Sequence, residues 1–112
     1  MGKFTVGTIV LVEFPFSNLK GHKIRPALVL AKVEFGNLVL CQITSKSYSS
    51  KTAIRIEISD FSEGQLPIIS YARPDKLFTA DASIIKSNAG RLNSAKRRAV
   101  LARVRQLFGQ SN

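Results

Sequence analysis

Apolar residues occur along this chain in short runs that are rich in β-branched side chains and are separated by turn residues. The first three runs span residues 8–14, 27–33 and 38–44. Such runs predict β-strands, and their lack of strict alternation favours strands that are buried on both faces. Pro26 suits the start or the edge of the second strand, and Gly36 with Asn37 predicts a hairpin that leads into the third.

The second half of the chain has a different pattern. Residues 53–58 alternate, with Arg55 and Glu57 pointing away from the isoleucines, which predicts a half-exposed strand. A turn region is predicted over 59–67 and extended pieces over 68–72 and 74–81. A short helix capped by Asp81 is predicted over 82–88.

The last predicted element is an amphipathic helix that begins with Ser94 as its N-cap and ends at Gly109. Its apolar face consists of Val100, Leu101, Val104, Leu107 and Phe108. Many strands followed by one helix predict a mainly β, barrel-like α+β domain. At 112 residues without a repeat or linker, we expect a single domain covering residues 1–112.

Charge narrows the range of functions. Seventeen Lys and Arg against seven Asp and Glu give a net charge of +10, which is typical of a protein that binds a polyanion. Nucleic acid is the leading partner class, an acidic protein the second and a membrane surface the third. One cysteine and one histidine exclude an intrachain disulfide and a structural zinc set. No signal peptide or membrane span is visible, so we expect a soluble cytoplasmic protein. We expect no cofactor.

Five segments in order carry a resemblance to a known family: GTIVLVEFPF, KIRPALVL, QITS, SYARPDKLFTAD and GRL before the last helix. Together they resemble the MazF/PemK (Kid-type) toxins of type II toxin-antitoxin systems over nearly the whole chain. The resemblance implies an SH3-like β-barrel with a C-terminal α-helix, assembled as a homodimer. It also implies a metal-independent, sequence-selective endoribonuclease that cuts single-stranded RNA, arrests growth and is silenced by an antitoxin with an acidic segment. The resemblance further implies that operator DNA is contacted only indirectly, through the antitoxin complex.

The resemblance also assigns catalytic residues. RNA is cut without metal when its 2′-hydroxyl attacks the adjacent phosphorus, which requires a base, an acid and cations for the phosphate charge. Arg25 of the Arg-Pro motif is assigned to the phosphate and Thr44 to a phosphate oxygen or the 2′-hydroxyl. Asp75 is the candidate base, and Arg73 the group that stabilises the leaving oxygen. The competing interpretations are a strand-end arginine, a turn-capping threonine and a surface ion pair.

Further residues are assigned to RNA contact. Lys20, Lys23, Lys46 and Lys51 are predicted to meet phosphates, and Tyr48 to stack on an unpaired base. The remaining candidates are His22, Gln42 and Ser45. His22 is better explained as a solvated loop residue, and the basic residues of the last helix as its solvated face. Two other functions stay open on the same fold: a non-catalytic RNA- or ribosome-binding module, and a toxin that poisons gyrase.

Overall fold

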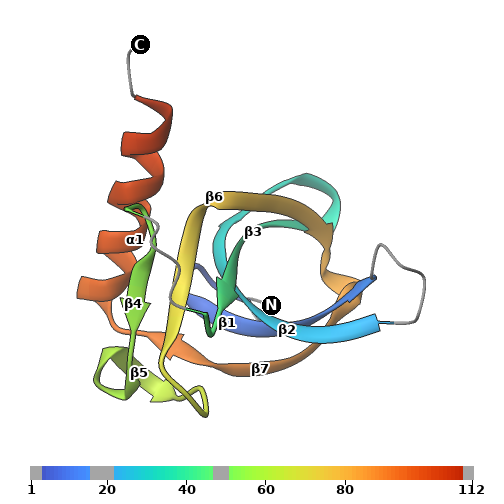
Figure 1. The fold of residues 1–112 in the computed structure, drawn as a ribbon. Coiled ribbons are helices and arrows are strands. Elements are labelled where there is room, and N and C mark those ends of the chain that lie inside the picture. The colour runs from blue at the N-terminus through green and yellow to red at the C-terminus, as the bar shows by residue number, and fades with distance from the viewer. Residues whose placement is uncertain (1–3, 16–21, 47–50, 110–112) are drawn as a thin grey trace.

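The computed structural model describes residues 4–15, 22–46 and 51–109 of the chain (Figure 1). Its strands form one curled antiparallel sheet in the order β4-β6-β3-β2-β1-β7-β5. A single α-helix follows the last strand and stands beside the sheet (Figure 1). The elements are β1 (Thr8–Pro15), β2 (His22–Lys32), β3 (Asn37–Thr44), β4 (Ile54–Ile56), β5 (Phe61–Gly64), β6 (Ser70–Asp81), β7 (Ile85–Leu92) and α1 (Ser94–Phe108). The predicted mainly β fold with a C-terminal helix is confirmed.

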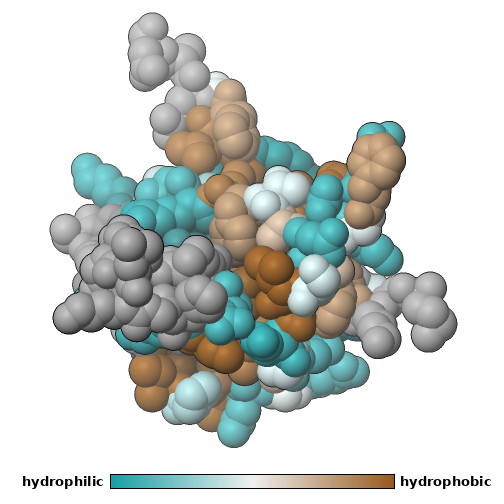
Figure 2. Space-filling view, turned by 90° about the vertical axis from the view of Figure 1, so that its right-hand side faces the viewer, coloured by the Kyte–Doolittle hydropathy of each residue, from teal (hydrophilic) through white to brown (hydrophobic). Residues whose placement is uncertain are grey.

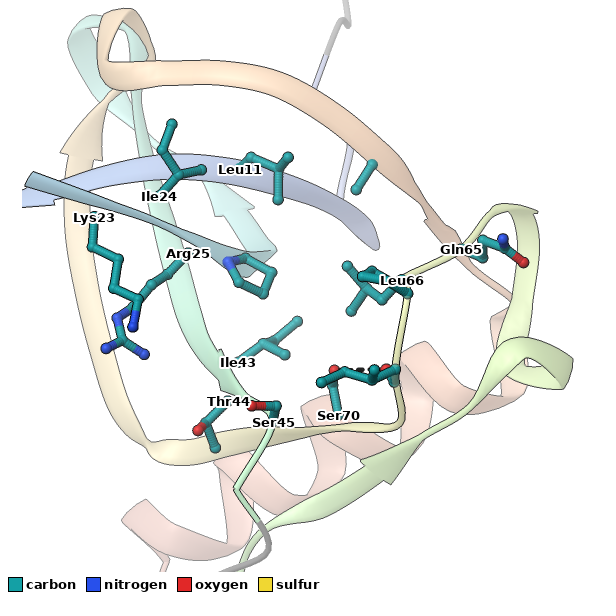
Figure 3. A pocket seen from close by; sticks show the side chains of 14 residues that line it. Leu11, Lys23, Ile24, Arg25, Ile43, Thr44, Ser45, Gln65, Leu66 and Ser70 are labelled. Carbon is teal, nitrogen blue, oxygen red and sulfur yellow. Dashed lines mark hydrogen bonds between the residues drawn. The ribbon is translucent and has the colours of Figure 1, made fainter.

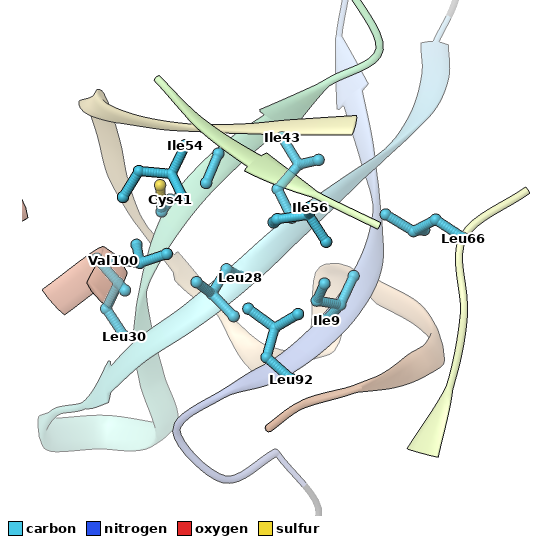
Figure 4. Packing of buried hydrophobic residues seen from close by; sticks show 11 residues of the cluster. Ile9, Leu28, Leu30, Cys41, Ile43, Ile54, Ile56, Leu66, Leu92 and Val100 are labelled. Atoms are coloured by element: carbon cyan, nitrogen blue, oxygen red, sulfur yellow. The ribbon is translucent and has the colours of Figure 1, made fainter. Parts of the chain in front are cut away.

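Apolar side chains pack on both faces of the central strands, as the unbroken apolar runs predicted. On one face lies the helix-side cluster, drawn in Figure 4: Ile9, Leu28, Leu30, Cys41, Ile43, Ile54, Ile56, Leu66, Ala72, Leu92 and Val100. On the other face lies the far-side cluster: Val10, Val12, Ala27, Val29, Leu38 and Leu40. Successive residues of β2 alternate between the two clusters, because neighbouring side chains of a strand point to opposite faces.

The predicted helix over 82–88 is wrong. Asp81 does cap a helical turn, since its carboxylate accepts a hydrogen bond from the backbone N–H of Ser83 at 2.8 Å. That turn is a 3₁₀ segment of only three residues, Ala82–Ile84, and the chain then continues as β7. β7 pairs with β1 on one side and with β5 on the other. Tertiary pairing therefore overrides the local cap signal.

The predicted turn region 59–67 is also partly wrong, because it contains β5. This strand pairs with β7 through two glycines, Gly64 opposite Gly90. A Cβ on Gly64 would lie 2.3 Å from the carbonyl oxygen of Ala89, and its φ of +67° also favours glycine. The preceding strand, β4, ends at Ile56, so Ile58 lies in a 3₁₀ turn with 65% of its surface exposed rather than in the predicted strand.

α1 begins one residue earlier than predicted, because Ser94 was expected to be the N-cap that precedes the helix. The N-cap is Asn93, whose Oδ1 accepts a hydrogen bond from the backbone N–H of Lys96 at 2.8 Å, and Ser94 is the first helical residue. Gly109 ends the helix, as predicted. Val100 is fully buried in the helix-side cluster, and Leu101 and Val104 pack against it.

Candidate functional site

The far-side face changes from apolar to polar at one end of β2 and β3. Ala27 of β2 lies opposite Gln42 of β3, and continuing this register by two residues brings Arg25 opposite Thr44. Arg25 also lies opposite Val12 of β1, a member of the far-side cluster, which fixes the face on which it stands. Cross-strand neighbours of this kind have Cβ atoms about 5 Å apart. The fold therefore brings together two of the predicted site residues.

Arg25 is held within a strand rather than in a loop. β2 begins at His22, so Pro26 does not open the strand as predicted but lies inside it, opposite Leu11 of β1. No carboxylate pairs with Arg25 among the residues that the structure describes, and its side chain is partly exposed. Lys23, two residues away, shares its face and is exposed. The strand end therefore presents two cations to solvent.

Thr44 is 6% exposed and lies at the last position of β3. Its Oγ1 accepts a hydrogen bond from the backbone N–H of Lys46 at 3.2 Å, which is the turn-capping role of the competing interpretation. A hydroxyl that accepts one bond keeps its proton to donate. Thr44 can therefore cap the turn and donate to an anion at the same time.

Arg73 and Asp75 form a bidentate pair where β6 departs from regular pairing with β3. The Nε of Arg73 donates to Oδ1 of Asp75 at 3.0 Å, and its Nη2 donates to Oδ2 at 2.8 Å. Between two successive pairs of opposite residues, β3 advances by two residues, from Cys41 to Ile43, whereas β6 advances by five. The Arg73 hydrogen bonds hold the pKa of Asp75 below its ordinary value, so the carboxylate stays ionised at neutral pH.

Cys41 lies directly behind this bulge. Its thiol donates to the carbonyl oxygen of Arg73 at 3.2 Å, a bond between β3 and β6 at the point where their regular pairing is interrupted. Burial raises the pKa of the thiol to about 12. A neutral, fully buried thiol is a poor nucleophile and ligand, so Cys41 serves packing and hydrogen bonding.

A cleft of about 430 Å³ opens beside Arg25 and Thr44, which both line it. In Figure 3 the side chains of Leu11, Ile43 and Leu66 border the open space, whereas the guanidinium of Arg25 points away from it. The lining is mainly apolar and also includes Ile24, Pro26, Pro67, Ile68 and Ala89. Its polar and charged members are Lys23, Arg25, Thr44, Ser45, Gln65 and Ser70. The cationic site therefore lies at the rim of the apolar cleft, at the same ends of β2 and β3.

Not all of the remaining residues predicted to contact RNA lie at this site in the described part of the chain. Lys20 and Tyr48 lie outside the described residues, and His22 belongs to β2 without a described side chain. Lys46 is exposed next to Thr44. Lys51 lies beside α1, because its backbone carbonyl oxygen accepts a hydrogen bond from Arg103 of that helix at 3.0 Å. Ser45 lines the cleft, and Gln42 is half-buried on the face of Arg25.

The last features concern metal-binding groups, helix length and the surface. Among the described residues, no three His, Cys, Asp or Glu side chains are grouped as a metal ion would need, and no helix has the length and apolarity to cross a membrane. Figure 2 shows the face on the right-hand side of Figure 1, where an apolar area near the centre is bordered by hydrophilic residues.

Sequence reasoning gave no role to Tyr71, although the segment that contains it was singled out. Tyr71 of β6 lies opposite Thr44 of β3, so its side chain is on the same face as the candidate site. The alternation of Ser70, Tyr71 and Ala72, with only the middle residue partly exposed, is visible in the pattern of β6. The register that places Tyr71 beside Thr44 is not visible in the sequence, because it depends on pairing between distant segments.

Comparison with known proteins identifies a family that matches this chain. The family described as "PemK-like, MazF-like toxin of type II toxin-antitoxin system" matches residues 5–108. The comparison with curated protein sequences gave no match.

Several solved structures have a similar fold. A mycobacterial endoribonuclease in complex with its cognate antitoxin has a TM-score of 0.74 at 14% identity, covering 96% of both chains. The Mycobacterium tuberculosis toxin MazF-mt6 has 0.72 at 16% identity, covering 94% of this chain and 99% of that one. A MazE-MazF structure from Deinococcus radiodurans, form II, has 0.75 at 18% identity, covering 95% and 96%.

Proposed function

Because the chain belongs to the PemK-like, MazF-like toxins of type II toxin-antitoxin systems, we propose that it is a metal-independent endoribonuclease that cuts single-stranded RNA. One observation carries the proposal: Arg25 and Thr44 lie at the same end of β2 and β3 and line the same cleft. Cleavage begins when the 2′-hydroxyl attacks the adjacent phosphorus, and it yields a 2′,3′-cyclic phosphate and a 5′-hydroxyl. In the cell this activity arrests growth.

Arg25 and Thr44 act on the phosphate. A guanidinium donates two parallel hydrogen bonds to phosphate oxygens and keeps its charge while negative charge grows in the transition state. The Thr44 hydroxyl donates to a phosphate oxygen or orients the 2′-hydroxyl, since its acceptor side is already bound to the Lys46 N–H. Lys23 and Lys46 add affinity through further phosphate contacts that do not read the base sequence.

Asp75 is the proposed base for the 2′-proton. Its lowered pKa ensures the proton-accepting form at neutral pH but weakens its basicity, so its contribution is smaller than that of a base with a pKa near 7. Arg73 holds Asp75 through two hydrogen bonds. It also stabilises charge on the leaving oxygen, because a guanidinium keeps its proton at neutral pH and is a poor proton donor.

Partners are proposed on the same basis. Solved structures with a similar fold include an endoribonuclease and a MazF bound to their antitoxins. For this chain we propose an antitoxin whose acidic segment complements the net charge of +10, and assembly as a homodimer. Contact with operator DNA is proposed only through the antitoxin complex.

The test is to incubate the antitoxin-free protein with a long single-stranded RNA in EDTA and to map the new ends. We expect cuts at defined sites with 5′-hydroxyl ends. Arg25→Gln and Thr44→Val remove the guanidinium charge and the hydroxyl at similar side-chain volume, and each is expected to lower the cleavage rate by about 100-fold or more. Arg98→Gln, on the exposed part of α1, is the matched control with unchanged cleavage.

Two results would contradict the proposal. Intact RNA after incubation with a folded wild-type protein would favour the binding-only module, which would also tolerate Asp75→Asn. Inhibition of gyrase without RNA cleavage would favour the third interpretation. Circular dichroism spectra that match the wild type are needed to interpret each variant.

A further inference from the structure

We propose that Tyr71 and Arg55 extend the catalytic face into a track for single-stranded RNA, in which Tyr71 stacks on a base and Arg55 binds a neighbouring phosphate. This inference rests on the proposed ribonuclease function and adds the direction that the RNA takes across the sheet. The residues Arg25, Thr44, Tyr71 and Arg55, here called the polar row, come from four neighbouring strands.

The register of the sheet aligns the polar row. Tyr71 of β6 lies opposite Thr44 of β3 on one side and opposite Arg55 of β4 on the other. Arg25 follows Thr44 on β2 when the printed register of β2 with β3 is continued. Residues that lie directly opposite one another point to the same face of a sheet. A cation, a hydroxyl, an aromatic ring and a second cation therefore stand side by side.

Tyr71 has the surroundings of a stacking residue. Its neighbours Ser70 and Ala72 are buried, whereas Tyr71 is half-buried with one side of the strand open to solvent. Its phenol has no hydrogen-bond partner among the described residues, so no polar contact within the described chain accounts for its hydroxyl. A ring held between Thr44 and Arg55 offers a base an aromatic surface beside the scissile phosphate.

Arg55 has the surroundings of a phosphate contact. Its side chain is 56% exposed and projects between the buried Ile54 and Ile56. Its Nε lies 3.4 Å from a carboxylate oxygen of Glu57. An ion pair between two half-exposed groups is worth little and is readily exchanged for a phosphate.

The length of the polar row separates the roles of its two arginines. Strands lie about 4.8 Å apart, so the three steps from β2 to β4 span about 14 Å. Side chains of a strand stand roughly perpendicular to the sheet, so the two guanidinium groups keep this separation and do not share one phosphate. The two arginines therefore bind different phosphates, with the base between them on Tyr71. The RNA strand runs across β2, β3, β6 and β4 rather than along them.

The test measures binding of a short, labelled, single-stranded oligonucleotide pool of mixed sequence with 2′-deoxyribose throughout, which cannot be cut by 2′-hydroxyl attack. Fluorescence anisotropy gives Kd over a series of salt concentrations. Tyr71→Leu keeps an apolar side chain but removes the aromatic ring, and we expect 10- to 100-fold weaker binding with an unchanged salt slope, in the range of about 1–3 kcal/mol per stacked base. Tyr71→Phe keeps the ring and should bind like the wild type.

Arg55→Gln tests the second phosphate. The slope of log K against log salt should become less steep by about 0.7, the value for one phosphate contact on a single strand. Arg105→Gln on α1 removes the same charge elsewhere and is the matched control. Tyr71→Leu with wild-type affinity, Tyr71→Phe as weak as Tyr71→Leu, or Arg55→Gln indistinguishable from Arg105→Gln would each overturn the track.

These outcomes are independent of cleavage. If wild-type protein leaves RNA intact but the variants weaken binding as described, the ribonuclease proposal fails and the track stands. If wild-type protein cuts RNA through Arg25 while Tyr71→Leu and Arg55→Gln bind and cut normally, the ribonuclease proposal stands and the track fails. A wild-type protein that does not bind the pool at all overturns the track as well.

Discussion

The thiol of Cys41 allows a quantitative test of how the core supports the candidate site. It is fully buried, and burial raises its pKa from 9.0 to about 12. Above pH 9 the unfolded chain releases the thiol proton and the folded chain keeps it, so the folded state binds more protons and stability falls as pH rises. Between pH 7 and pH 10 this single group lowers the free energy of unfolding by about 1.4 kcal/mol.

The perturbation is Cys41→Ala, which removes the titrating group. The variant loses the buried sulfur and its hydrogen bond to the Arg73 carbonyl, and is expected to be less stable by about 2 kcal/mol at pH 7. The difference between wild type and variant should then shrink as pH rises to 10, because only the wild type contains the thiol. All other ionisable groups are common to both proteins, so their contributions cancel in the difference.

The assay is urea unfolding followed by far-UV circular dichroism at several pH values from 7 to 10. A difference in the free energy of unfolding that stays constant over this range would refute the reasoning, because it would mean that Cys41 has the same pKa in both states. A second measurement is the reaction with a thiol reagent, which should be slow in the native protein and fast in urea. Rapid reaction of the native protein would contradict the burial of the thiol.

Four further predictions concern other parts of the fold. Val100→Ala removes two buried methyl groups between α1 and the sheet and should lower the free energy of unfolding by about 2 kcal/mol in urea unfolding. Gly64→Ala should cost about 3 kcal/mol or more, because its Cβ would collide with the Ala89 carbonyl at a positive φ, whereas Ser62→Ala on the same exposed strand should change stability little. Asn93→Ala removes the cap of α1 and should cost about 1 kcal/mol, measured in the same way. Asp75→Asn should flatten the acid limb of the stability curve below pH 4, since the lowered pKa of Asp75 contributes stability that is lost as the carboxylate is protonated; unchanged acid unfolding would contradict this.

The sequence predicted the central strands and the last helix correctly because their signals are local. The apolar runs of β1, β2 and β3 and the helical spacing around Val100 do not depend on distant partners. β7 was missed because an aspartate cap and polar residues resemble a helix start, whereas pairing with β1 decides the outcome. β5 was missed because four residues with a terminal glycine resemble a turn.

The candidate site was predictable in part. Arg25, Thr44, Arg73 and Asp75 were named from motifs, and the structure places them at one end of β2, β3 and β6, with Arg73 and Asp75 in direct contact. Tyr71 and Arg55 could not be assigned, since their position beside Thr44 follows from the register of β6 with two other strands. Registers of this kind are set by the whole sheet, so no short window of sequence contains them.

The bulge of β6 opposite Gln42 has a consequence for how sequences of this fold can diverge. The bulge adds three residues to β6 relative to β3. On each side of the bulge, pairing with β3 fixes the face of the sheet to which each residue points. Deleting a single residue there would exchange the faces of Tyr71 and Ala72, moving a polar ring into the hydrophobic core. Deleting or inserting two residues would leave Tyr71 and Ala72 on their present faces and change only the length of the bulge. Length variation among related chains should therefore occur at this point in steps of two residues.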